Sequence, residues 1–210
     1  MKKHSAKQFT LIEMMVVMAI IAILAGILFP AVMAVKDKAK AKETQTLVAS
    51  VSTAIMQFKG EYNYLPSPDT STPGKDEAYG SFDKNNPRAK PDNKYRQFFD
   101  VLTYSNHANK KGGPSSNAEE VNTKGITFLT APNSYFSEND FECSMRDSWG
   151  QGLVVKLDYS GDDIVDIGSS DVNTPVNWTF KTQSVVLSAG KQNAGELNKS
   201  EFIGSPRLDD

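Results

Sequence analysis

The hydrophobic positions of the chain are concentrated in one run near its start. From Met14 to Val35, twenty-two consecutive residues carry no charged or strongly polar side chain. A helix rises about 1.5 Å per residue, so this run is long enough to cross a hydrocarbon core of roughly 30 Å. The pattern predicts a membrane-spanning helix over residues 9–35. A short basic leader over residues 1–8, with no apolar stretch of its own, precedes it.

Beyond the apolar run, the sequence predicts that the helix continues over residues 36–60. No proline interrupts this stretch, and Gly60 marks its expected end. The apolar positions that repeat at helical spacing are Leu47, Val51, Ile55 and Phe58. We expect this stripe to pack on a sheet of the same chain, whereas the lysine-rich turns from Lys36 to Lys42 are expected to form a solvated neck.

The remaining residues, 61–210, are predicted to form one globular head with long loops. Two polar segments, residues 62–93 and 105–125, are rich in Pro, Gly, Asn and Lys and are predicted to be loops. The segment 95–104 between them has apolar residues four positions apart and predicts a short helix.

The C-terminal third has the composition of β-structure. Strands are predicted over residues 153–157, 164–167 and 184–187, with residues 178–180 as a weaker candidate. The six residues 158–163 are rich in turn formers and predict a hairpin between the first two strands. The elements together predict an α+β fold, in which a long N-terminal helix packs on a small antiparallel sheet of three or four strands.

Charge and cysteine content narrow the function classes. The chain has 23 basic and 25 acidic residues and a formal net charge of −2. Without the leader lysines Lys2, Lys3 and Lys7, 20 basic minus 25 acidic residues leaves −5. This balance argues against a nucleic-acid-binding surface. The single cysteine, Cys143, leaves no intrachain disulfide.

No catalytic constellation stands out along the chain. The two histidines are His4, in the leader, and His107, in a polar loop, and neither belongs to a recognisable motif. We therefore expect no enzyme activity. The densest acidic group is Asp158, Asp162, Asp163 and Asp166. Its spacing is not that of an EF-hand, and it is expected to be a solvated hairpin tip rather than a metal site.

One carboxylate, Glu13, lies a single residue before the apolar run, where a charge is costly if it enters the bilayer. The order of a charged leader, then Phe9-Thr-Leu-Ile-Glu13, then an apolar helix containing Pro30 resembles the class III signal of type IV pilins and type II secretion pseudopilins. The resemblance implies that a prepilin peptidase cuts between Gln8 and Phe9 and methylates the new amino group. The family's leader normally ends in glycine, so Gln8 departs from the pattern and puts efficient cleavage in question.

The resemblance also implies a function and a location. It implies a structural subunit of a type II secretion pseudopilus, with the prepilin peptidase, copies of itself, other pseudopilins and an inner-membrane assembly platform as partners. The alternatives are a type IV pilus subunit and an uncut, membrane-anchored periplasmic binding protein. Lysines flank the span on both sides, so their count alone does not decide the orientation. The resemblance implies a single-pass inner-membrane protein with a cytoplasmic N-terminus and a periplasmic head.

Two residues of the apolar segment are predicted to act in assembly. Glu13 has two interpretations: an acid favoured by the positive end of its own helix, or the partner of a neighbouring subunit's Phe9 ammonium, which would set the register of packed helices. Pro30 lacks an amide hydrogen, so we expect a bend or an unwound stretch between Gly26 and Pro30 in the assembled state.

Two short segments of the head extend the resemblance. The turn Asp147-Ser-Trp149-Gly150 resembles the Asp-Pro-Trp-Gly turn of the major pseudopilins, and residues 187–190 resemble their final Ser-x-Gly segment. The major pseudopilins bind calcium in the loop that follows. Here that loop offers Glu196 and Glu201 but no aspartate, and Lys191 and Lys199 lie close to them in the sequence. Calcium takes six to eight oxygens, usually with more than one carboxylate, so we expect no calcium in this loop.

Overall fold

The computed structural model describes residues 9–68, 70, 74–80, 93–106, 113–130, 145–168, 177–192 and 202–206. The helices in this part of the chain are α1 (Leu11–Tyr62), α2 (Asn93–Thr103) and α3 (Ser116–Val121). The chain divides into two units, Met1–Lys40 and Ala41–Asp210. The first contains the N-terminal part of α1, and the second is the head.

The head is built on a four-stranded antiparallel sheet in the order β1-β2-β5-β6. Its strands are β1 (Glu77–Tyr79), β2 (Leu153–Leu157), β5 (Ser184–Ser188) and β6 (Ile203–Ser205). A second, two-stranded antiparallel sheet consists of β3 (Val165–Ile167) and β4 (Trp178–Phe180). The long helix and the antiparallel sheet confirm the predicted α+β fold.

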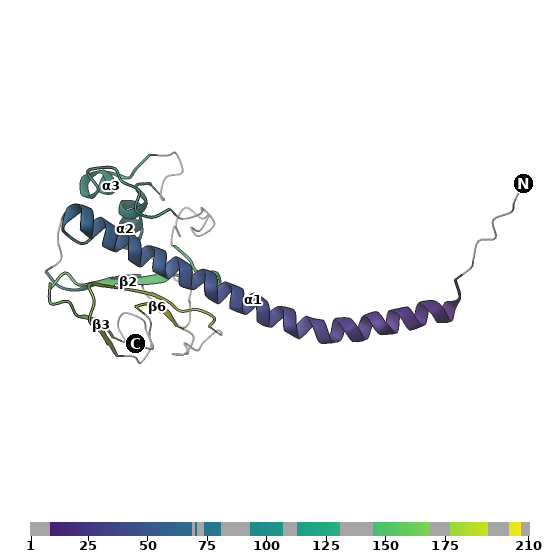
Figure 1. Ribbon diagram of the computed structural model, residues 1–210. Helices are drawn as coiled ribbons and strands as arrows, with labels where there is room; N and C mark the ends of the chain where they lie inside the picture. The colour runs from purple at the N-terminus through teal and green to yellow at the C-terminus, as the bar shows by residue number, and fades with distance from the viewer. Residues whose placement is uncertain are drawn as a thin grey trace, which may run out of the picture. The chain divides into compact units, whose positions relative to one another are not determined.

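The apolar stripe of α1 packs where it was expected to. Leu47, Val51, Ile55 and Phe58 are all buried in one core cluster. The same cluster holds Phe98 and Phe99 of α2 and Leu153, Val155 and Leu157 of β2. Figure 1 shows this part of α1 between the sheet and the two short helices.

The opposite face of the sheet is also covered. Val154, Val185 and Leu187 point away from the first core and join Val165 and Ile167 of β3 in a second apolar cluster. Because both faces of the sheet are covered, every residue of β5, a central strand, is buried.

The predicted hairpin between residues 153–157 and 164–167 is wrong. β2 pairs with β1 and β5, while β3 pairs with β4. The reason lies in Asp158, whose carboxylate accepts hydrogen bonds from Gly161 N at 2.6 Å, Ser160 Oγ at 2.9 Å and Asp163 N at 2.8 Å. These bonds hold residues 158–163 together in a compact loop, and the chain leaves the main sheet at this loop.

The structure contains three short elements that the sequence did not predict. β1 belongs to the polar segment 62–93, α3 belongs to the segment 105–125, and β6 follows the last predicted strand. Ser115 is the N-cap residue of α3, and its hydroxyl accepts a hydrogen bond from Ala118 N at 3.2 Å. Elements of three to six residues are too short to produce a recognisable hydrophobic period, which is why the sequence pattern did not predict them.

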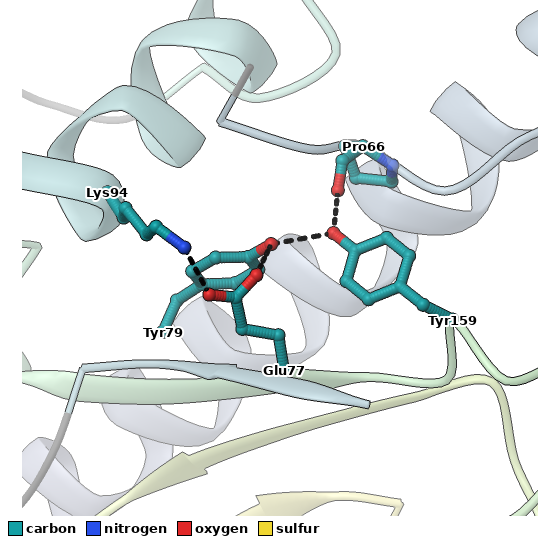
Figure 2. Close-up of polar contacts among 5 residues, drawn as sticks. All are labelled: Pro66, Glu77, Tyr79, Lys94 and Tyr159. Atoms are coloured by element: carbon teal, nitrogen blue, oxygen red, sulfur yellow. Dashed lines mark hydrogen bonds and ion pairs between the residues drawn. The ribbon is translucent and has the colours of Figure 1, made fainter. Parts of the chain in front are cut away.

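Tyr79 and Tyr159 form hydrogen bonds that hold the segment directly after α1 against the rest of the head (Figure 2). Tyr159 donates to the Pro66 carbonyl oxygen at 2.6 Å, and its hydroxyl lies 2.8 Å from that of Tyr79. Tyr79 also lies 3.3 Å from Glu77 Oε2, and Lys94 Nζ pairs with Glu77 Oε1 at 2.6 Å. Each tyrosine has one hydroxyl hydrogen, and that of Tyr159 is used in the bond to Pro66. Tyr79 therefore donates mainly to Tyr159, and its longer contact with Glu77 is the weakest of the three.

Candidate functional site in the N-terminal part of the long helix

The first turn of α1 contains a capping box formed by Thr10 and Glu13. Thr10 N and Thr10 Oγ1 both donate to Glu13 Oε2 at 2.8 Å, and Glu13 N donates to Thr10 Oγ1 at 3.3 Å. Since α1 begins at Leu11, Thr10 is the N-cap residue and Glu13 the third helical residue, which is the spacing of this motif. The carboxylate therefore accepts the amide and hydroxyl hydrogens of Thr10, the N-cap residue of its own helix.

The capping box does not involve the leader. Its backbone donors are the amides of Thr10 and Glu13, both of which follow the Gln8–Phe9 bond where cleavage is predicted. Gln8 itself lies outside the described residues. The same hydrogen bonds can therefore exist before and after removal of residues 1–8.

One oxygen of Glu13 remains available for a further contact. Both hydrogen bonds from Thr10 end on Oε2, and Oε1 has no hydrogen-bond donor among the residues that the structure describes. The side chain is exposed. A carboxylate can accept about four hydrogen bonds, so Glu13 could bind a cation of another molecule without giving up its role in the cap.

The apolar segment that follows is exposed on all sides. From Phe9 to Val35, every residue is exposed, and Phe9 itself is 73% exposed. α1 is the one helix in the described part of the chain that is long and apolar enough to cross a membrane. A helix that is hydrophobic all round is normally buried, in lipid or among other helices. The segment fits a membrane anchor.

The helix is continuous through Gly26 and Pro30. A Cβ placed on Gly26 would meet nothing within 4 Å, so no contact within the chain requires glycine there. A bend or unwound stretch between these two residues in an assembled state stays a prediction.

The two head segments singled out in the sequence lie against each other. Asp147 Oδ2 accepts a hydrogen bond from Ser188 Oγ at 2.5 Å, while Asp147 Oδ1 accepts from Trp149 N and Gln151 N, each at 2.8 Å. Burial raises the pKa of Asp147, although these hydrogen bonds oppose the shift. Gly150 closes the turn with φ of 82°, a conformation that favours glycine.

The same turn contacts the part of α1 that belongs to the head. Ser148 Oγ donates to Glu43 Oε2 at 2.7 Å, and Ser148 N donates to Thr44 Oγ1 at 3.3 Å. A proline at this position could make neither bond, because it has no amide hydrogen and no hydroxyl. The serine that departs from the Asp-Pro-Trp-Gly pattern thus gives the turn two additional bonds to the helix.

The acidic residues of the head gather differently from the sequence-based expectation. Carboxylate oxygens of Asp76, Asp158 and Asp162 all lie within 4.8 Å of one another, and Asp76 was not singled out in the sequence. Burial opposes ionisation of Asp158, but the hydrogen bonds that it accepts outweigh this effect and hold its pKa below the ordinary value. Asp166 lies on β3. Glu196, Glu201 and Cys143 lie outside the described residues.

The N-terminal segment matches a family model. Residues 9–29 match the model described as the prokaryotic N-terminal methylation motif. The match begins at Phe9, one residue before the capping box, and ends within the apolar segment. No curated protein and no solved structure matches the chain significantly.

Proposed function

We propose that this chain, which carries the class III prepilin signal of type IV pilins and pseudopilins, is a structural subunit of a type II secretion pseudopilus. The observation that carries the proposal is the coincidence of the methylation motif with a segment that is apolar and exposed all round. Lipid covers such a segment before assembly, and the same segments of other subunits cover it afterwards. Its partners are copies of itself, other pseudopilins and an inner-membrane assembly platform.

Processing precedes assembly in this proposal. A prepilin peptidase cuts between Gln8 and Phe9 and methylates the new α-amine, and the head lies in the periplasm. The chain then begins with an ammonium group next to an apolar helix. No catalytic role is assigned to any residue of the head.

The turn of the head supports a pseudopilin rather than an adhesive pilus subunit. Asp147 joins the Asp-Ser-Trp-Gly turn to Ser188 at the end of β5, so the two segments that resemble the major pseudopilins form one local structure. The single cysteine leaves the head without the paired cysteines of an adhesive pilin. A type IV pilus subunit is the second candidate, because the N-terminal signal is common to both.

The mass of the protein isolated from membranes tests the processing step. We expect a chain that begins at N-methyl-Phe9. A chain that retains Met1 or Lys2 in the assembled fraction would contradict the proposal and would favour an uncut membrane-anchored binding protein. Deleting the gene and assaying secretion and surface pili separately would distinguish the two filament systems.

Glu13 is proposed to set the register between adjacent helices. Once helices pack away from water, the Phe9 ammonium of one subunit needs a negative partner, and a neighbouring Glu13 can supply its Oε1 while Oε2 remains in the capping box. Buried ion pairs give specificity more surely than stability, which suits a contact that selects one stagger.

A further inference from the structure

Three lysines follow the apolar segment directly. Lys36, Lys38 and Lys40, which we call the lysine collar, are all exposed. Asp37 is the one acidic residue among residues 36–40, so the local formal charge is three minus one, or +2. Lys42 is left out of the collar because it belongs to the head unit and its Nζ donates to Gln45 Oε1 at 3.1 Å.

The position of the collar along the helix matches the headgroup layer of a bilayer. Residues 14–35 span about 33 Å at 1.5 Å per residue, close to the thickness of the hydrocarbon core. The collar then lies about 1.5–7.5 Å beyond Val35 along the axis. A bilayer of about 40–45 Å with a core of about 30 Å has a headgroup zone of roughly 5–8 Å on each side.

The collar also surrounds the helix instead of forming a patch on one side. At about 100° per residue, Lys36 and Lys40 lie about 40° apart, while Lys38 lies on nearly the opposite side. A protein partner docked beside the helix would meet one of these sides. A lipid leaflet surrounds the helix and meets both.

Helix stability explains the lysines only in part, because Asp37 lies three residues before Lys40, a spacing that favours an ion pair on a helix. Lys36 and Lys40 are like charges at i and i+4, an arrangement that destabilises a helix. The helix continues to Tyr62, so the collar is far from the C-terminus, where basic residues favour the helix dipole. An anionic layer around the helix would remove the repulsion between these charges.

We infer that the lysine collar binds the phosphate groups of anionic phospholipids in the leaflet from which α1 emerges toward the head. Each lysine near an anionic membrane surface strengthens the attraction to that surface about fivefold. In this proposal lipid headgroups surround these residues, for which the sequence predicted a solvated neck. The inference requires that the helix spans a membrane, and it does not depend on filament assembly.

The test uses the full chain in proteoliposomes of phosphatidylcholine with a trace of spin-labelled lipid. At about 0.01–0.1 M salt, we expect labelled phosphatidylglycerol to associate with the protein about fivefold more strongly than labelled phosphatidylcholine. The preference should largely disappear at 1 M salt, where the Debye length falls to about 3 Å. The triple variant Lys36→Gln, Lys38→Gln, Lys40→Gln should lose most of it.

Two further variants separate the collar from other charges. The matched control Lys75→Gln, Lys181→Gln, Lys191→Gln removes the same charge from exposed lysines of the head and should keep the preference. The leader variant Lys2→Gln, Lys3→Gln, Lys7→Gln removes three charges on the other side of the apolar segment and should keep most of the preference. Equal association of the two lipids with the wild-type chain, or an unchanged preference in the collar variant, would overturn the inference. A loss as large in the head control would also overturn it.

Discussion

The hydrogen bonds at the start of α1 allow the two roles of Glu13 to be separated by substitution. A capping box accepts either glutamate or glutamine at its third helical position, so Glu13→Gln keeps the cap and removes the charge. Thr10→Ala does the reverse. It removes the hydroxyl that donates to Glu13 Oε2 at 2.8 Å and accepts from Glu13 N at 3.3 Å, and it keeps the carboxylate.

The two changes differ in expected magnitude. Loss of an N-cap side chain costs about 0.5–2 kcal/mol and affects the first turn of the helix. Removal of one member of a buried ion pair costs about 3–5 kcal/mol, which is roughly a hundredfold to a few thousandfold in an equilibrium constant. If the neighbouring ammonium depends on the carboxylate, Thr10→Ala should lower incorporation into filaments modestly, whereas Glu13→Gln should nearly abolish it.

The assay expresses each variant as the sole copy and compares the sheared filament fraction with the membrane pool. All variants should insert and be cleaved, and Glu13→Asp should be intermediate because its side chain is shorter. Glu120→Gln, which removes the charge of an exposed glutamate on α3, is the matched control and should assemble normally. Normal assembly of Glu13→Gln together with failure of Thr10→Ala would refute charge pairing, and the capping box alone would then explain the glutamate.

Three further predictions concern the head and the leader. Tyr159→Phe removes the donor to the Pro66 carbonyl and should lower the free energy of unfolding by about 1–2 kcal/mol, or Tm by about 2–8 °C. The control Tyr104→Phe should change Tm little, because the Tyr104 hydroxyl has no hydrogen bond in the described part of the chain. Equal shifts in Tm for the two variants would contradict this prediction. The folded-state pKa of Asp158 is lowered, so its contribution is complete above the unfolded value of about 3.9 and is lost as pH falls through the folded value. The stability difference between wild type and Asp158→Asn in chemical denaturation should therefore shrink as the pH falls below about 4, and a constant difference would show that the charge is irrelevant. Gln8→Gly should shorten the lifetime of the precursor in a pulse-chase experiment, and identical lifetimes would show that Gln8 does not slow the peptidase.

Local patterns predicted most elements of the head but not how they pair. The stripe of α1 could be predicted because a helix places residues four apart on one face whatever the rest of the chain does. Strand pairing has no such local signature. Val155 pairs with Val186 on one side and Tyr79 on the other, and both partners are distant in sequence. The turn-rich residues 158–163 suggested a hairpin because composition does not reveal that Asp158 closes the loop on itself.

The candidate site shows the same division between local and distant contacts. The spacing of Thr10 and Glu13 already matches a capping box, so this role was accessible from the sequence and was missed. The hydrogen bond between Asp147 and Ser188 joins residues 41 positions apart. Resemblance had selected both segments separately, but only the fold shows that they touch. Asp76 could not be linked to Asp158 from sequence for the same reason.

The two parts of α1 differ in a way that separates folding from assembly. After residue 43 the helix is amphipathic, and its buried side chains from Thr44 to Phe58 lie on the face that builds the head. Before residue 36, every described side chain is apolar or belongs to the capping box, and none is buried. The head therefore obtains its core without using the N-terminal part. Substitutions that keep residues 14–35 apolar should leave the stability of the head unchanged, so defects that they cause can be assigned to insertion or to contacts between subunits.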